Sequence, residues 1–438
     1  MLENSHVIGL NASDFAILPT AKSFHQQLLS AIAGAKHRIY IIALYLQEDD
    51  AGRSVLNALF DAKQRNPNLD IKVIVDHHRA IRGLIGEKAH GGNRQWYREV
   101  ASNYNETIEI YGAAIKPKEL FGVLHLKGMV FDDDVVYSGA SINNVYLHVG
   151  DRYRLDRYFT VKSKMLADSI VNFIDKAFIH SGTHTNLLAH ELPSKAEVNK
   201  LSKRTRRLIQ KNQYTFDSAA MSSISLKPLL GLGRRKNLLN QATCQLIKSS
   251  QSSVCLYTPY FNLPRRLTKE VVAAMKRGVA VTVIVGDKRA NDFFIPEGKP
   301  FSFIGVVPYI YETILARFVK RYQSFIDKGL LDIRLWKHDD NSFHLKGINV
   351  DQCRYLLTGS NLNPRAWQLD IENGLLLEDE QGILAEAFAQ EHAAICQHTQ
   401  PLLHFSQLDE ISDYPEQPRR LIRRVKMAKV DRLLKRLL

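Results

Sequence analysis

Apolar and polar residues follow the same order in two stretches of the chain. Apolar residues at helical spacing predict helices, and short runs of β-forming apolar residues predict buried strands. By these patterns the first stretch forms a helix at 23–33, a strand at 38–46, a helix at 55–60 and a strand at 71–76. The second forms a helix at 241–248, a strand at 254–257, a helix at 267–276 and a strand at 281–285. This alternation predicts parallel sheet covered by helices.

The two stretches also match in detail, since Lys72–Ala80 and Thr282–Ala290 both end a strand and close on Arg-Ala. We therefore predict an internal duplication with an α/β fold of two similar α/β/α lobes, and a repeat this long is a duplicated domain rather than a solenoid. The lobes cover about Phe24–Phe178 and Asn240–Gln397. The predicted division is an N-terminal lobe at 1–190, a linker at 191–238, a C-terminal lobe at 239–400 and a tail at 401–438.

Charge and composition limit which cellular compartment and which binding partners are expected. The 438 residues carry a net charge of +14, which favours polyanions: nucleic acid, a ribosome or a membrane rich in anionic lipid. Apolar runs stay under ten residues, and the N-terminus lacks a basic region followed by an apolar core. We therefore predict neither a spanning helix nor a signal peptide. Four cysteines without C-x-x-C favour a reducing cytoplasm.

Two basic segments leave alternatives open. The linker crowds cations into Lys195–Lys211 and then carries apolar residues at Met221, Ile224, Leu226, Leu229, Leu230 and Leu232. It reads either as a solvated linker or as an apolar loop, flanked by cations, that dips into a membrane interface. Arg419–Leu438 has nine Lys or Arg and one acid, Asp431. For this tail, membrane surface, nucleic acid and core packing all remain open.

The clearest chemical signal is a string that occurs twice. His125, Lys127 and Asp132 recur as His344, Lys346 and Asp351, and both copies read H-x-K-x4-D. Histidine serves as nucleophile or general acid–base, and lysine stabilises negative charge on phosphate oxygens. Brought together between two lobes, one histidine can attack phosphorus while the other protonates the leaving oxygen. This scheme requires no metal and no cofactor. The two aspartates are kept as positioning residues on turns.

Further polar residues recur after each motif. A serine stands sixteen positions after each histidine and asparagines follow, which gives candidate phosphate donors at Ser141, Asn143, Ser360, Asn361 and Asn363. Asp156 and Glu372 come later, and we assign one of them to each histidine, in an order that the sequence leaves open. Arg79 and Arg82 follow a strand end, where they either contact the substrate or are ordinary surface charge.

The paired motifs resemble those of the phospholipase D superfamily. Within it, the stretches Tyr137–Asn143, Val145–His148 and Val75–Gly83 look like the bacterial phosphatidylserine synthases of the phospholipase D type. The resemblance implies one composite active site at the lobe interface and a peripheral protein at the cytoplasmic membrane face. It implies reaction of CDP-diacylglycerol with L-serine to give phosphatidylserine and CMP. Gly139-Ala140 and Thr358-Gly359 depart from the superfamily's Gly-Ser or Gly-Gly pair.

The resemblance also implies a ping-pong reaction. We assign the attack on the lipid-side phosphorus to His125, and the transfer of protons to CMP and from serine to His344; the reverse assignment stays open at this point. The alternatives within the superfamily are a phospholipase D, a cardiolipin synthase and, on the strength of the basic surface, a nuclease.

Overall fold

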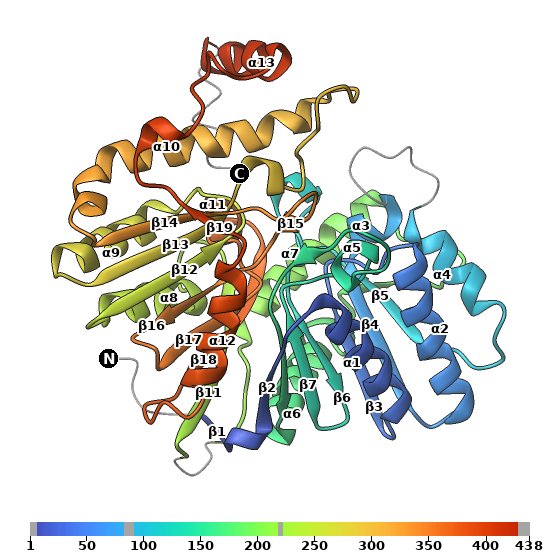
Figure 1. Cartoon of the computed structure of the whole chain (residues 1–438). Helices are drawn as coiled ribbons and strands as arrows, with labels where there is room; N and C mark the ends of the chain where they lie inside the picture. Colours follow the sequence, from blue (N-terminus) through green and yellow to red (C-terminus); the bar gives the residue numbers. More distant parts are fainter. Residues whose placement is uncertain (1–6, 83–91, 218–221, 428–438) are drawn as a thin grey trace.

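The computed structural model describes residues 7–82, 92–217 and 222–427, which form two sheet-centred lobes side by side (Figure 1). In spatial order the first lobe's sheet contains β10 (His184–Asn186), β5 (Glu109–Ala113), β4 (Asp70–Asp76), β3 (Arg38–Ile42), β6 (Gly128–Phe131), β7 (Asp134–Ser138), β9 (Tyr158–Lys162) and β2 (Phe15–Leu18). The second contains β1 (Ile8–Leu10), β11 (Ile224–Leu232), β18 (Ile371–Glu378), β17 (Arg354–Thr358), β16 (Gly347–Val350), β12 (Ser253–Thr258), β13 (Ala280–Gly286), β14 (Leu331–Trp336) and β19 (Thr399–Pro401).

The strand order confirms the predicted duplication and α/β class. In the first lobe β3, β4 and β5 are parallel and β6 runs antiparallel to β3; β12, β13, β14 and β16 repeat this arrangement in the second. The predicted parallel sheet is confirmed for β3, β4 and β5 and for β12, β13 and β14, whereas β6, β7 and β9 pair antiparallel. Only two residues, Asp132 and Asp133, join β6 to β7, and so short a connection permits only a hairpin.

Helices cover the sheets as the apolar spacing predicts. The four predicted helices are α1 (Ala21–Gly34), α2 (Asp50–Arg65), α8 (Leu238–Lys248) and α9 (Arg265–Lys276). The structure also contains the α-helices α3 (His77–Arg82), α4 (Asn93–Ala101), α5 (Asn144–Leu147), α6 (Lys164–Ile174), α7 (Lys195–Lys211), α10 (Val307–Asp327), α11 (Pro364–Gln368), α12 (Ala385–Cys396) and α13 (Glu416–Met427). Helix α2 begins earlier than predicted because Asp49 caps it, accepting from Gly52 N at 2.9 Å.

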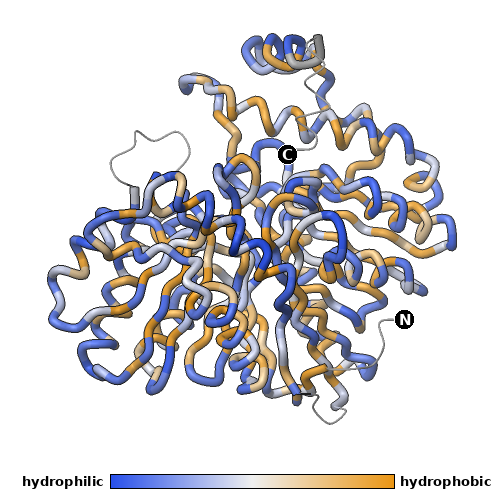
Figure 2. The backbone as a smooth tube through the Cα atoms, turned by 180° about the vertical axis from the view of Figure 1, so that it is seen from behind, coloured by the Kyte–Doolittle hydropathy of each residue, from blue (hydrophilic) through white to orange (hydrophobic). Residues whose placement is uncertain are grey.

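One hydrophobic core belongs to both lobes. It joins side chains such as Tyr137 and Phe178 of the first lobe to Leu226, Tyr355 and Leu377 of the second, all almost completely buried. Figure 2 shows hydrophobic residues concentrated along the strands, whereas α13 is mainly hydrophilic. Burying one such side chain stabilises a fold by about 1.5–3 kcal/mol, so this shared core holds the two lobes in a fixed relation.

The structure corrects the prediction of an apolar loop in the linker. Residues 224–232 form strand β11, which pairs with β18 and with β1, and Ile224, Leu226 and Leu230 are at most 2% exposed. These side chains fill the core and are not available to a membrane. The sequence pattern misled because the neighbouring Ser and Gly residues suggest a loop. Met221 lies outside the described residues.

The basic tail packs at its start against helix α10. Ile422 is 4% exposed and joins Tyr309, Tyr414 and Val306 in a small apolar cluster. Lys288 forms ion pairs with Glu312 on α10 and with Asp409, so the segment leading to α13 is held by charge as well. Core packing therefore accounts for this part of the tail. Residues 428–438 lie outside the described residues.

Candidate active site

Both motif histidines stand at the same edge of their sheets. His125 comes just before β6 and His344 just before β16, so both lie at the carboxyl ends of the parallel strands, where α/β proteins bind ligands. Each motif lysine is followed by a glycine with positive φ, 132° at Gly128 and 147° at Gly347. A Cβ on Gly347 would lie 2.9 Å from the backbone oxygen of Leu356, so this position requires glycine for space as well as for conformation.

The main chain of each motif histidine is hydrogen-bonded to the other lobe. The amide of His125 donates to the carbonyl of Ile371 at 3.0 Å, and the amide of His344 donates to that of Leu155 at 2.8 Å. A two-stranded parallel pair, β8 (Arg154–Leu155) with β15 (Ser342–Phe343), continues the second contact. The backbone of the two lobes is therefore interlocked at the histidines.

This exchange sets a carboxylate of one lobe against the histidine of the other. Nδ1 of His125 lies 2.8 Å from Oε2 of Glu372, and Nδ1 of His344 lies 3.1 Å from Oδ2 of Asp156. The sequence leaves the pairing open, and the structure crosses it between the lobes. A carboxylate at Nδ1 favours the tautomer with the proton on that nitrogen, which leaves Nε2 of each ring to react.

The two motif lysines lie beside this pair and are 1% exposed. Nζ of Lys346 lies 3.1 Å from Oδ2 of Asp156 and also contacts Nδ1 of His344. Lys127 is fixed through its backbone, since Asn373 accepts from its amide at 2.9 Å and donates to its carbonyl at 2.7 Å. Burial lowers the pKa of Lys127 to about 8 and lowers the pKa of Lys346 as well.

The histidines are neutral at neutral pH for the same reason. Burial, followed by the charges of Lys127 and Lys346, lowers the pKa of His125 well below its ordinary value. Burial and Lys346 lower the pKa of His344 to about 4, although Asp156 opposes them. The His344 ring also contributes to the shift at His125, so the two rings share one electrostatic environment. A neutral ring offers the lone pair that a nucleophile needs.

The surroundings shift the pKa values of the two carboxylates in opposite directions. Burial raises the pKa of Glu372 well above its usual value, and the neighbouring Asp370 adds to the effect. At Asp156 burial also raises the pKa, but Lys346 and His344 outweigh it, and the pKa lies below its usual value. His344 therefore has the partner better suited to stabilise an imidazolium, the form that donates a proton to a leaving group.

The turns after β7 and β17 meet at the lobe interface. A Cβ on Gly139 would lie 2.6 Å from Oδ1 of Asp156, and a Cβ on Gly359 would lie 3.0 Å from Cγ of Lys127. The departures from the superfamily pattern thus keep glycine at the two close contacts. The predicted serines Ser141 and Ser360 follow in these turns and are 2% and 4% exposed.

The predicted asparagines have mixed surroundings. Asn143 and Asn363 cap α5 and α11, accepting from Tyr146 N at 3.0 Å and from Ala366 N at 2.9 Å. Their side-chain oxygens are thus engaged in holding helices. The Oδ1 atom of Asn361 is buried and has no hydrogen-bond partner among the described residues. This atom needs a donor from outside the chain, as a bound substrate or water would supply.

The motif aspartates are remote from the histidines. Oδ1 and Oδ2 of Asp132 accept from the amides of Lys36, His37 and Arg38 at 2.8–3.0 Å. Asp351 accepts from the amides of 251–253 at 2.8–3.1 Å in the same way. Both have positive φ, 53° and 52°, at the far ends of β6 and β16. They fasten a turn to the start of a strand, so their place is structural rather than beside the reacting groups.

The two predicted arginines form ion pairs with Glu119, and we call these three residues the rim cluster. Arg79 and Arg82 lie 2.8 and 2.5 Å from the two carboxylate oxygens of Glu119. Arg365 donates to the backbone carbonyl of Glu119 at 2.9 Å and contributes to the lowered pKa of His125. The cluster is therefore near the first histidine, and substrate contact by Arg79 and Arg82 stays a prediction.

Sequence reasoning missed a group of residues around His344. The hydroxyl of Tyr146 lies 2.9 Å from Nδ1 of His344, and the guanidinium of Arg154 lies 4.7 Å from the centroid of the Tyr146 ring. Nε of Arg154 lies 2.9 Å from Oδ1 of Asp292, whose other oxygen accepts from Tyr260. These residues have no motif of their own. Only Tyr146 had a signal in the sequence, because it lies in a stretch that resembles the family.

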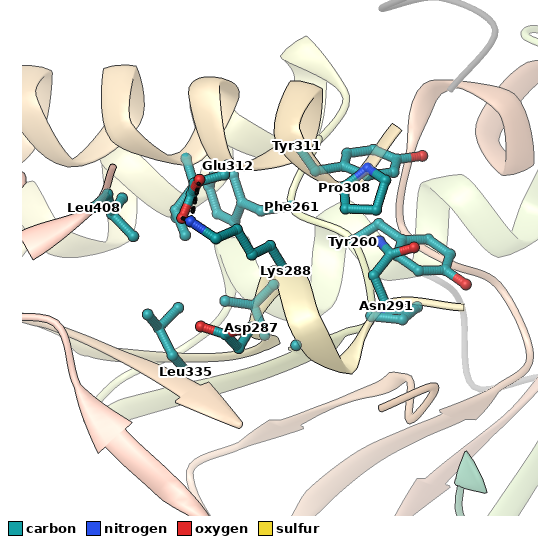
Figure 3. Close-up of a pocket in the computed structure, with 14 residues that line it drawn as sticks. Tyr260, Phe261, Asp287, Lys288, Asn291, Pro308, Tyr311, Glu312, Leu335 and Leu408 are labelled. Carbon is teal, nitrogen blue, oxygen red and sulfur yellow. Dashed lines mark hydrogen bonds and ion pairs between the residues drawn. The ribbon is translucent and has the colours of Figure 1, made fainter. Parts of the chain in front are cut away.

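A small pocket in the second lobe adjoins this group. Figure 3 shows Tyr260 and Asn291 at one end, Tyr311 on α10 above them, and Lys288 reaching to Glu312. The rings of Tyr260 and Tyr311 are stacked with centroids 5.2 Å apart. The stacked rings close one side of the space next to His344, whose ring centroid is 6.1 Å from that of Tyr260.

Comparison with known proteins agrees with this geometry. The family described as "Cardiolipin synthase, PLD-like domain" matches residues 28–176 and 243–397, one match in each lobe. A CDP-diacylglycerol–serine O-phosphatidyltransferase of Haemophilus influenzae is 42% identical over 100% of this chain and 97% of its own length. The chain belongs to the family of this PLD-like domain, within the phospholipase D superfamily.

Two further comparisons support the assignment. The CDP-diacylglycerol–serine O-phosphatidyltransferase of Escherichia coli is also 42% identical, over 97% of this chain and 94% of its own. A crystal structure of phosphatidylserine synthase from Haemophilus influenzae superposes with a TM-score of 0.95 at 41% identity, covering 100% of this chain and 98% of that one. The resemblance and the fold predicted from sequence are thus confirmed.

Replacing Asp132 or Asp351 tests their structural place in this family member. We expect Asp132→Asn and Asp351→Asn to lower the free energy of unfolding by about 1–3 kcal/mol each, because they weaken hydrogen bonds to three amides. Activity per folded molecule should stay close to wild type. Glu372→Gln is the matched comparison and should lose activity. Urea titration with a parallel activity assay measures both, and activity loss without destabilisation in the aspartate variants would contradict the assignment.

The lowered pKa of His344 predicts a pH dependence of stability. The ring titrates near 6.5 when unfolded and at about 4 when folded, so the unfolded chain binds more protons between these values. Its contribution to stability is complete above pH 6.5 and is lost as pH falls toward 4. Between pH 7 and 4.5 we expect the wild type to lose about 2–3 kcal/mol more than His344→Gln, measured by urea unfolding. Equal losses would show that folding does not lower the pKa of this ring.

Proposed function

We propose that this protein transfers the phosphatidyl group from CDP-diacylglycerol to L-serine, giving phosphatidylserine and CMP. The observation that carries the proposal is the crossed pairing of two buried histidines with two carboxylates in a site shared by the lobes. The full-length similarity to named serine O-phosphatidyltransferases supports the choice of substrates. The two lysines supply positive charge for the non-bridging phosphate oxygens.

The first half-reaction transfers the lipid to the protein. Nε2 of His125, neutral and oriented by Glu372, attacks the lipid-side phosphorus of CDP-diacylglycerol. The nitrogen–phosphorus bond forms as the bond to the CMP oxygen breaks. His344, supported as an imidazolium by Asp156, gives its proton to the departing CMP. Bound phosphate raises the pKa of the buried histidines, so His344 can carry that proton although it is neutral in the empty site.

The second half-reaction releases the product. The serine hydroxyl attacks the phosphatidyl-histidine and gives its proton to Nε2 of His344. The oxygen–phosphorus bond forms, and the bond to His125 breaks. Both steps take place at one phosphorus atom, and each histidine returns to its starting state.

An acceptor assay tests the reaction class. With CDP-diacylglycerol in detergent micelles we expect radiolabelled serine to enter lipid, with far less transfer to phosphatidylglycerol or water, and no nicking of plasmid DNA. His125→Ala and His344→Ala should each reduce turnover by at least about a thousandfold, since each histidine acts in both half-reactions. Mass spectrometry of a quenched His344→Ala reaction should find the lipid adduct on His125. DNA nicking without serine incorporation, or an adduct on His344 in a quenched wild-type reaction, would refute the respective assignment.

We further propose that the protein works peripherally at the cytoplasmic membrane face. Within residues 7–82, 92–217 and 222–427, no helix combines the length and the apolar character that crossing a membrane requires. Leu120 and Phe121 are 54% and 47% exposed beside the Arg79–Arg82 rim cluster. Lys116, nearby, is close enough to Arg206 of basic helix α7 for the two charges to interact. An apolar tip among cations fits an anionic lipid surface, which would also present the acyl chains of the substrate.

Vesicle flotation tests this surface. The double change Leu120→Ser with Phe121→Ser should weaken binding to vesicles of phosphatidylglycerol and phosphatidylcholine by roughly tenfold or more, because two apolar side chains lose their burial in lipid. Leu403→Ser is the matched control, since Leu403 is 62% exposed on the second lobe. Equal binding by the double variant and the control would place the membrane contact elsewhere.

A further inference from the structure

Asp292 is a carboxylate beside the active site that the proposed reaction does not use. It follows the short helix η4 (Lys288–Ala290), beyond the end of β13. Its Oδ2 accepts from the Tyr260 hydroxyl at 2.7 Å and lies 4.0 Å from Nε2 of His344. Its side chain is 11% exposed. The carboxylate therefore faces the nitrogen that takes the proton of the incoming alcohol, and not the nitrogen that Asp156 already holds.

The carboxylate is ionised and rigidly held. Burial raises the pKa of Asp292, but Arg154 and His344 outweigh it and the pKa lies below the usual value. The Tyr260 hydroxyl donates to Oδ2, and Arg154 forms an ion pair with Oδ1. The 4.0 Å to His344 is too long for a direct hydrogen bond, so the two groups leave room for a ligand that bridges them.

Asp292 also lines a large polar cavity. The cavity has a volume of about 1160 Å³ and is lined by charged residues that include Arg152, Arg289 and Lys337. It lies on the second lobe, between η4, β14 and the segment that precedes α13. A small zwitterion could reach Asp292 through this space from water, on a path separate from the rim cluster around Arg79.

The duplication shows that the charge at this position has diverged between the lobes. In the register that aligns Ala80 with Ala290, Asp292 occupies the place of Arg82. In this register Arg79 and Arg289 keep the same charge, so the divergence is confined to one position, where the first lobe has Arg82 and the second has a carboxylate near His344. A cation suits a pyrophosphate donor, and a carboxylate suits a cationic acceptor.

We propose that Asp292, held by Tyr260, binds the ammonium group of the acceptor while His344 takes the proton of its hydroxyl. This subsite rests on the proposed function and deepens it, because it identifies the acceptor class as a 1,2-amino alcohol. Such a molecule carries a hydroxyl and an ammonium group on neighbouring carbons. The hydroxyl can donate to Nε2 of His344 and the ammonium to Oδ2 of Asp292, two atoms 4.0 Å apart, through hydrogen bonds of about 2.8 Å. The serine oxygen then bonds to phosphorus as the bond to His125 breaks.

Acceptor selectivity in the full-length protein tests the subsite. L-Serine and 3-hydroxypropanoate, which has hydrogen in place of the ammonium, compete for the phosphatidyl group of CDP-diacylglycerol. We expect Asp292→Asn to raise KM for serine roughly 10- to 100-fold, through the loss of a charge-assisted hydrogen bond, and to reduce the preference for serine by a similar factor. Exchange of radiolabelled CMP into CDP-diacylglycerol, which involves no acceptor, should change far less.

Two further variants make the result decisive. Tyr260→Phe keeps the carboxylate but loosens it, and should raise KM for serine by a smaller factor, so the subsite is testable even where Asp292→Asn folds poorly. Asp339→Asn alters an exposed carboxylate of the same cavity and should leave both values unchanged. Unchanged selectivity in Asp292→Asn, or loss of CMP exchange equal to the loss of serine transfer, overturns the subsite alone. A wild-type protein that incorporates no serine overturns the proposed function with it.

Discussion

The structure depends on a reciprocal exchange in which each lobe supplies the carboxylate for the other lobe's histidine. The amide of each histidine donates to the carbonyl of the residue just before the carboxylate that its ring contacts. The backbone and the side chain of each histidine are therefore fixed together. Each of these two hydrogen-bonded histidine–carboxylate pairs takes one member from each lobe. A buried charge without its partner costs several kcal/mol, which ties the integrity of the site to the packing of the two lobes against each other. The core shared by both lobes maintains that packing.

The same arrangement prepares the site for an anion. Lys127 and Lys346 are buried together, and both contribute to lowering the pKa of His125. In the empty site these like charges are costly, and burial adds to the cost. A phosphate between the histidines relieves both effects, because it pairs with the lysines and favours the protonated form of a histidine. Binding the donor and preparing the general acid are thus a single electrostatic event.

The sequence was sufficient for the parts of this site that recur. The histidines, lysines and carboxylates stand at matching places in a duplicated pattern, and the duplication alone predicts that they meet. It could not reveal the crossing of Asp156 and Glu372, because hydrogen bonds between lobes follow from strand pairing in three dimensions. It also misjudged the apolar run 224–232, where tertiary packing made a buried strand of residues with loop-like neighbours. The group around Asp292 escaped because it has no counterpart of like charge in the first lobe.

Symmetry of the fold and asymmetry of the chemistry have different origins in this chain. The duplicated strands and glycines place the two histidines equivalently. The reaction requires this placement, because a single phosphorus atom is attacked first from one side and then from the other. The reaction is not symmetric, however, since one ring bonds to phosphorus while the other moves a proton. The differences arise where the repeats have diverged: a raised pKa at Glu372 against a lowered one at Asp156, and cations near His125 against a carboxylate near His344. Because Asp292 follows η4 and does not lie in a strand, the second lobe could acquire this carboxylate without disturbing the shared core.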